Sequence, residues 1–181
     1  HLSLNQQRSH PFPALPNEGR YSDLFAKGVL SRLYQYLGEN FGRVLYNSFE
    51  EGLSKTLQDR IIENGITTQK ITFADRMLFD EMVEKAVKGR YKTVVIDSLQ
   101  YMGFTYGQYK KFVDRCPKKS LIIISQVNGR GTIKGGTDLL HAVDMPAYFT
   151  AGHLTVKGRF RKGVYETQLF GGKRSNQLRL I

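Results

Sequence analysis

The sequence contains very little cysteine and no long apolar run. Its one cysteine among 181 residues, Cys116, excludes an intrachain disulfide and a cysteine-rich metal cluster. Its longest purely apolar run, Leu121–Ile124, is far too short to cross a bilayer, so we expect no membrane partner. A single thiol and no recognisable signal peptide predict a cytoplasmic protein. A zinc site is not expected, because no metal-ligand spacing relates the four histidines, His1, His10, His141 and His153.

Acidic residues are also few relative to basic ones. The chain has 27 Lys and Arg against 16 Asp and Glu, so its formal net charge is +11. Such an excess favours a polyanionic partner, such as a nucleic acid or a nucleotide. Hydrophobic residues make up 40% of the chain and charged residues 24%, which is typical of one globular domain with its own core.

The two ends of the chain differ in composition from the middle. Residues 1–20 hold three of the five prolines and no apolar periodicity, which predicts an extended arm. Residues 21–170 are predicted to form the core domain. Residues 171–181 begin with Gly171–Asn176, a basic segment that either contacts DNA or is a solvated end.

The middle of the chain alternates between helical periodicity and short apolar runs. We predict helices over 28–39, 53–64, 80–88 and 106–115, and strands over 43–48, 71–73, 93–97 and 120–125. Strands without internal alternation, separated by helices, indicate an α/β fold with a mostly parallel sheet flanked by helices. Residues 148–156 and 164–170 alternate more, which predicts a C-terminal antiparallel hairpin that extends this sheet.

Polar side chains follow three of the predicted strands. In an open parallel sheet, ligands bind at the carboxyl ends of the strands. Asp97 would there hold the water shell of Mg²⁺, although an Asp that starts a loop or caps a helix is an equally good interpretation. Glu50 would polarise a water for attack on a phosphoryl group, and Glu51 would stabilise the first turn of the next helix. Gln126 would sense a γ-phosphate.

A glycine-rich segment, residues 127–136, follows Gln126. It contains four glycines and two cations, Arg130 and Lys134. Flexible backbone with positive charge suits the phosphates of single-stranded DNA. A solvated surface loop is the alternative interpretation.

Four blocks in this order resemble the RecA-type ATPase core, in particular its RadA/Sms and replicative-helicase-like branches. Residues 43–51 resemble the second strand of that family with its catalytic glutamate, and residues 93–98 resemble its Walker B strand. Residues 124–136 resemble its sensor and DNA-binding loop. Residues 157–160 resemble the Lys-Asn-Arg-Phe-Gly segment of the RadA branch, with Gly in place of Asn. The resemblance covers residues 27 to 170.

The resemblance implies an ATPase that uses ATP and Mg²⁺ and acts on DNA in recombination, repair or replication. It implies that Glu50 is catalytic, that Asp97 holds the metal, and that Gln126 couples the nucleotide state to the DNA-binding loop. In the RadA branch, the cations matching Lys157 and Arg159 reach a nucleotide across a subunit interface. A homo-oligomer, as a ring or a filament, is therefore expected.

The Walker A loop of the family, G-x-x-x-x-G-K-[S/T], has no match in the sequence. Counting back from Tyr46 places the family's phosphate-binding lysine near Lys27. The next residue is Gly28, whereas the family has at this position a Ser or Thr that ligates Mg²⁺. Residues 23–25 leave no room for the strand and glycines that should precede this lysine. Either the protein is a nucleotide-free relative, or a strand and loop are missing from the 181 residues. We favour the second interpretation, because the fold would lose its core without its central strand.

Two other functions compete with an ATPase. A catalytically inactive RecA-like module would bind DNA or a protein partner by charge, without binding ATP. An oxidoreductase of the Rossmann type is disfavoured, because no G-x-G-x-x-G follows any strand. Tyr101, Tyr106 and Tyr109 would either stack on bases or, as we prefer, lie in an aromatic core or a subunit contact.

Overall fold

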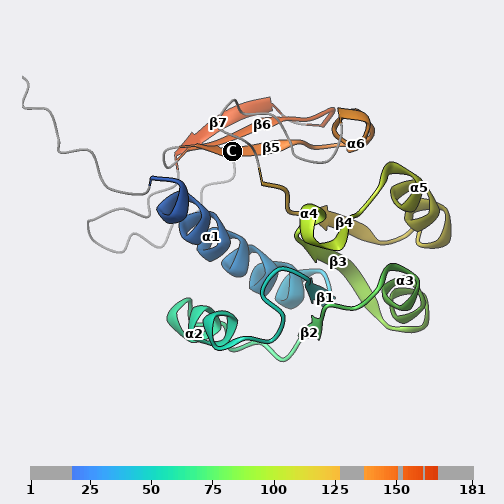
Figure 1. Cartoon of the computed structure of the whole chain (residues 1–181), viewed down its shortest axis with the longest axis horizontal. Helices are drawn as coiled ribbons and strands as arrows, with labels where there is room; N and C mark the ends of the chain where they lie inside the picture. Colours follow the sequence, from blue (N-terminus) through green and yellow to red (C-terminus); the bar gives the residue numbers. More distant parts are fainter. Residues whose placement is uncertain (1–17, 127–136, 151–152, 161, 167–181) are drawn as a thin grey trace, which may run out of the picture.

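The computed structural model describes residues 18–126, 137–150, 153–160 and 162–166 (Figure 1). The helices are α1 (Glu18–Asn40), α2 (Lys55–Glu63), α3 (Phe79–Lys88), α4 (Leu99–Met102), α5 (Tyr106–Arg115) and α6 (Thr137–Ala142). The strands are β1 (Arg43–Ser48), β2 (Ile71–Asp75), β3 (Tyr91–Asp97), β4 (Ser120–Ile123), β5 (Ala147–Thr150), β6 (His153–Lys157) and β7 (Lys162–Glu166). None of the helices in these described ranges is long and apolar enough to cross a membrane.

The main sheet is parallel and has four strands in the order β2-β1-β3-β4. This order and direction confirm the predicted α/β class with a mostly parallel sheet. Strand β1 is central, and its register places Ser48 opposite both Asp75 of β2 and Asp97 of β3. The carboxyl ends of these strands therefore meet at one edge.

The C-terminal strands form a sheet of their own. Strands β5, β6 and β7 make a three-stranded antiparallel sheet that lies above the main sheet in Figure 1. The prediction that these residues extend the main sheet is therefore wrong. Alternation along a strand reports that one of its faces is exposed, but it does not report which sheet the strand joins.

Helices cover both faces of the main sheet. Figure 1 shows α1 and α2 on one face and α3 and α5 on the other. Side chains alternate along the strands, so Val44, Tyr46 and Val95 pack against α1 and α2. Leu45 and Val94 pack on the opposite face against α3 and α5. Burial on both faces is the reason why the strands have apolar runs rather than alternation.

The first helix differs most from its prediction. Helix α1 begins at Glu18, ten residues before the predicted start at Gly28, so residues 18–20 are helical and do not belong to the predicted arm. The sequence does contain a pattern that indicates this longer helix, because Tyr21, Leu24 and Phe25 have the i, i+3, i+4 spacing of a helical face.

Candidate functional site

The carboxyl edge of the main sheet brings together two of the predicted site residues. The backbone N–H groups of Phe49 and Glu50 both donate to the carbonyl oxygen of Asp97, at 2.5 and 2.9 Å. Glu50 is half-buried, whereas Asp97 is fully buried. The backbone that carries Glu50 is thus fixed to the end of β3.

The Asp97 side chain is enclosed by aromatic residues that the sequence analysis did not select. The phenol of Tyr46 donates a hydrogen bond to Oδ2 of Asp97. The ring of Tyr34, on α1, lies 5.2 Å from the ring of Tyr46. Both tyrosines are buried, at 3% exposure. The carboxyl of Asp97 therefore faces α1 and is oriented by a phenol from the neighbouring strand.

These two phenols remain neutral over the usual pH range. Burial raises the pKa of Tyr34 well above its ordinary value, and the nearby carboxylate of Asp97 raises it further. The same two causes raise the pKa of Tyr46, whose hydrogen bond to Asp97 contributes as well. The positive charge of Arg60 opposes both shifts. Tyr46 is therefore held in the protonated form that can donate to Asp97.

Glu51 has a different role from the predicted one. Helix α2 begins at Lys55, with Ser54 as its N-cap, so Glu51 does not lie in the first turn. Its carboxylate pairs instead with the guanidinium of Arg60, which is only 5% exposed. The prediction that Glu51 stabilises the start of the helix is therefore wrong. Its charge compensates a buried cation, which would otherwise be costly to desolvate.

The end of β2 adds an exposed cation to the same edge. The Arg76 N–H donates to the Ser48 carbonyl at 3.2 Å, and the Arg76 side chain is 54% exposed. Gly52 has a φ of +63°, and a Cβ there would lie 2.5 Å from Oδ1 of Asp75. The positive φ favours glycine at this position, whereas the Asp75 carboxylate is exposed and could move away from a Cβ.

Gln126 is positioned by a residue of α4. The side-chain amide of Gln100 donates to the Gln126 carbonyl at 3.1 Å, and its oxygen accepts from the Gln126 N–H at 3.2 Å. The Leu99 N–H donates to the Ile124 carbonyl at 2.8 Å. The segment after β4 is thereby joined to the segment after β3, so Gln126 lies at the carboxyl edge with Asp97.

Lys27 and Gly28 do not lie at the start of a helix. Both are internal to α1, where backbone N–H groups are hydrogen-bonded along the helix and do not form a phosphate-binding loop. A Cβ at Gly28 would lie 3.3 Å from Oδ1 of Asn64, at the end of α2. Close packing of two helices is thus a sufficient reason for glycine at 28. The predicted roles of both residues stay predictions.

The other predicted cations lie in the antiparallel sheet or outside the described ranges. Lys157 ends β6, and its Nζ lies 5.5 Å from the centre of the Tyr148 ring. Arg159 follows β6, and its side chain lies 3.7 Å from the carboxylate of Asp144. Arg130 and Lys134 fall outside the residues that the structure describes.

Two of the three tyrosines near α5 make contacts within the chain. The rings of Tyr106 and Tyr109 stack at 6.3 Å, and the Tyr109 hydroxyl donates to the Ala142 carbonyl at 3.0 Å. Tyr109 thus joins α5 to α6, while Tyr101 is 56% exposed.

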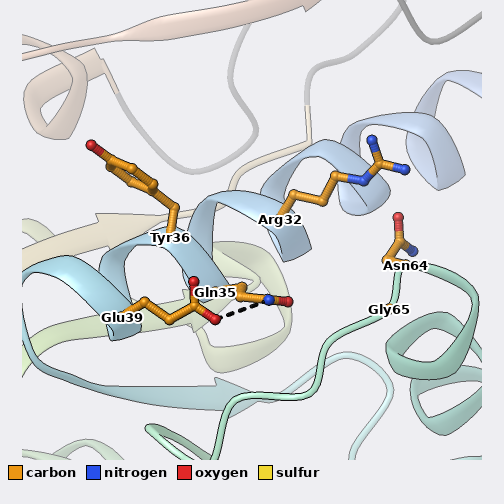
Figure 2. A pocket seen from close by; sticks show the side chains of 6 residues that line it. All are labelled: Arg32, Gln35, Tyr36, Glu39, Asn64 and Gly65. Carbon is orange, nitrogen blue, oxygen red and sulfur yellow. Dashed lines mark hydrogen bonds between the residues drawn. The ribbon is translucent and has the colours of Figure 1, made fainter. Parts of the chain in front are cut away.

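A shallow pocket lies between α1 and the end of α2 (Figure 2). Its lining consists of Arg32, Gln35, Tyr36, Glu39, Asn64 and Gly65. Gln35 already donates to Glu39 at 3.0 Å, as Figure 2 shows. None of the residues that line this pocket is a predicted site residue.

The oxygen donors at the carboxyl edge fit Mg²⁺ better than a transition metal. No group of three His, Cys, Asp or Glu that could hold a metal ion occurs in the described part of the chain. Mg²⁺ does not need one, because it usually takes one or two carboxylates and keeps several waters or phosphate oxygens. Near Asp97, the buried hydroxyls of Ser48 and Ser98 have no hydrogen-bond partner among the described residues. The chemistry of these donors is compatible with a hard cation.

The fold and this edge together define an α/β protein with a mostly parallel four-stranded sheet, helices on both faces and a separate antiparallel sheet. A search against protein-family models finds no match, and a search of curated proteins finds none either.

Proposed function

We propose that the protein is a RecA-like ATPase that couples ATP binding and hydrolysis to DNA binding in recombination, repair or replication. One observation carries the proposal: the backbone of Glu50 is hydrogen-bonded to the end of the Asp97 strand, at the edge where Gln126 is also held. Parallel sheets bind their ligands at this edge. The net charge of +11 supports polyanionic ligands.

Each residue would contribute through its position and charge. The carboxylate of Glu50 would orient a water and take its proton. Asp97, with its carboxyl oriented by Tyr46, would hold Mg²⁺ together with the hydroxyl of Ser98. A bound Mg²⁺ supplies charge neutralisation at phosphate oxygens. Lys157 and Arg159 would act on the nucleotide of a neighbouring subunit in a homo-oligomer.

The second candidate function is a catalytically inactive RecA-like module that binds DNA or a replication partner. Two observations favour it. Helix α1 continues through Lys27 without a break, so no phosphate-binding loop precedes this lysine among the described residues. Apolar clusters also form on both faces of the described four-stranded sheet, so the core of the described residues does not require a further strand.

Hydrolysis of ATP with and without single-stranded DNA distinguishes the two candidates. The ATPase proposal expects turnover that DNA stimulates, and a loss of about 100-fold or more in Glu50→Gln, because the general base is removed. The matched control is Glu84→Gln, which changes an exposed carboxylate on α3 and should retain full turnover. No turnover in the parent protein, with DNA binding retained, would instead establish the binding module.

A further inference from the structure

The turn that joins β6 to β7 carries an exposed aromatic ring among cations. Phe160 is 82% exposed, the largest fraction among the large apolar side chains that the structure describes. Lys157, Arg159 and Lys162 are all exposed beside it. We call residues 157–160 together with Lys162 the hairpin tip. A ring this exposed contributes little to the packing of the described residues, so we consider a role in binding.

The base of the hairpin tip is fixed to the segment before β5. The Lys157 N–H donates to the Pro146 carbonyl at 2.9 Å, and the Arg159 N–H donates to the Asp144 carbonyl at 3.0 Å. Gly158 is buried between these bonds, and a Cβ there would lie 2.8 Å from Cγ of Met145. The backbone is therefore held up to the residue before Phe160. A ring presented on a fixed backbone loses little entropy when it binds.

The charges of this hairpin act against folding. Residues 153–166 contain four Lys or Arg and one acidic residue, Glu166, which pairs in register with His153 at the opposite end. Lys157 and Lys162 are register partners, and like charges directly opposite each other destabilise a sheet. Asp144 offsets part of the charge of Arg159, at 3.7 Å. A polyanion would remove the remaining repulsion.

We propose that the hairpin tip binds single-stranded nucleic acid. The ring of Phe160 stacks on an unpaired base, while Lys162 contacts a phosphate beside that base. Aromatic side chains within a basic groove are the usual means of binding single strands without sequence preference. A membrane surface would need a broader apolar face than one ring at a turn. The proposal deepens the DNA-binding part of the proposed function, and it does not depend on hydrolysis.

The chain contains no tryptophan, which permits a direct spectroscopic test. In Phe160→Trp, the introduced indole is the sole tryptophan and keeps a stacking face. Addition of an oligothymidylate without nucleotide should quench its fluorescence, with an affinity close to that of the parent protein. Phe160→Leu keeps an apolar side chain without the π-face and should weaken binding by about 5- to 140-fold. Lys162→Ala should lower the salt slope of binding by about 0.7.

Matched controls separate stacking from general effects. Phe41→Leu makes the same change at a 61% exposed ring after α1, and Val164→Ala shortens a 66% exposed side chain in β7. Both should bind the oligonucleotide as the parent does. Equal affinity of the parent and Phe160→Leu, with no quenching in Phe160→Trp, overturns the proposal even if ATP is hydrolysed. Quenching by anionic vesicles but not by the oligonucleotide also overturns it. Quenching by the oligonucleotide in a protein without turnover supports it and refutes only the ATPase proposal.

Discussion

A hydroxyl from the neighbouring strand helps to orient Asp97. Tyr46→Phe removes the hydrogen bond donated to the buried Oδ2 and leaves the ring packing against Tyr34 unchanged. Because a buried acceptor then loses a partner, we expect the free energy of unfolding to fall by about 1–3 kcal/mol. Urea denaturation of the parent and the variant measures this difference.

The control for this change is Tyr36→Phe, since Tyr36 is 47% exposed on α1. Surface substitutions of this kind usually change stability by less than about 0.5 kcal/mol. If the two variants lose the same stability, the Tyr46 bond contributes no more than an ordinary surface hydroxyl.

The same tyrosines give stability a dependence on alkaline pH. Burial raises the pKa of Tyr34 and of Tyr46 in the folded protein above the ordinary tyrosine value of 10.0. Above pH 10 the unfolded chain releases protons that the folded chain retains, so the free energy of unfolding falls as the pH rises. Below pH 10 both states keep these protons, and this contribution to stability is complete. Denaturation midpoints between pH 8 and 11 should decline less steeply in the double variant Tyr34→Phe with Tyr46→Phe than in the parent.

The sequence contains a signal for some site residues but not for their partners. Glu50, Asp97 and Gln126 each follow an apolar run, and parallel pairing brings such positions to one edge. Tyr46 donates a hydrogen bond to Asp97, which lies 51 positions away in the sequence. Gln100 donates one to Gln126, which lies 26 positions away. Such contacts are set by strand register and helix placement, which no local pattern encodes. The prediction for Glu51 was wrong for this reason, because its partner Arg60 lies in the following helix.

At the scale of elements, strong local signals gave accurate predictions. Helix α5 has the predicted bounds, since Thr105 and Gln108 form a capping box at its start and Pro117 follows its end. Helix α1 was predicted too short, because the composition of residues 1–20 outweighed a weaker helical spacing. The sheet to which β5–β7 belong could not be predicted, because pairing across the chain is a tertiary property.

Gly158 is the residue on which the antiparallel sheet depends most clearly. In Gly158→Ala, the added Cβ would meet the Asp144 carbonyl at 3.0 Å and Cα of Met145 at 3.1 Å, both of them backbone atoms that cannot easily move. We expect a loss of about 1–3 kcal/mol in the local stability of β6, as for other overpacked sites. Hydrogen exchange at the β6 amides measures it.

Gly107→Ala is the matched control for this substitution. Gly107 lies in α5, and its Cβ would meet only Oγ1 of Thr105, at 3.9 Å. Alanine favours the helix by roughly 1 kcal/mol over glycine, so this variant should be at least as stable as the parent. Equal destabilisation by both substitutions would show that the close contact at 158 has no energetic consequence.

The described residues form two parts, the main sheet with its helices and the C-terminal part with α6 and the antiparallel sheet. The main contacts between these parts are those of α1 with β5 and of α5 with α6. The Tyr109 hydroxyl bond to Ala142 reinforces the second contact. The main sheet, by comparison, has apolar clusters on both of its faces. We therefore expect the antiparallel sheet to open without unfolding the main one.

Cys116 reports on this behaviour, because it is the single cysteine, caps the end of α5 and belongs to the core, 3% exposed. Burial raises the pKa of its thiol, so a thiol reagent should label it only after the main sheet opens. Met82→Ala removes a fully buried side chain of the same cluster and should cost about 2–5 kcal/mol, which accelerates labelling by about 30- to 4,000-fold. Gly158→Ala should change the labelling rate by less than about threefold, a change of under 1 kcal/mol. A much larger acceleration in Gly158→Ala would mean that the two sheets unfold as one cooperative unit. The destabilisation of β6 would then also lower the stability of the core around Cys116.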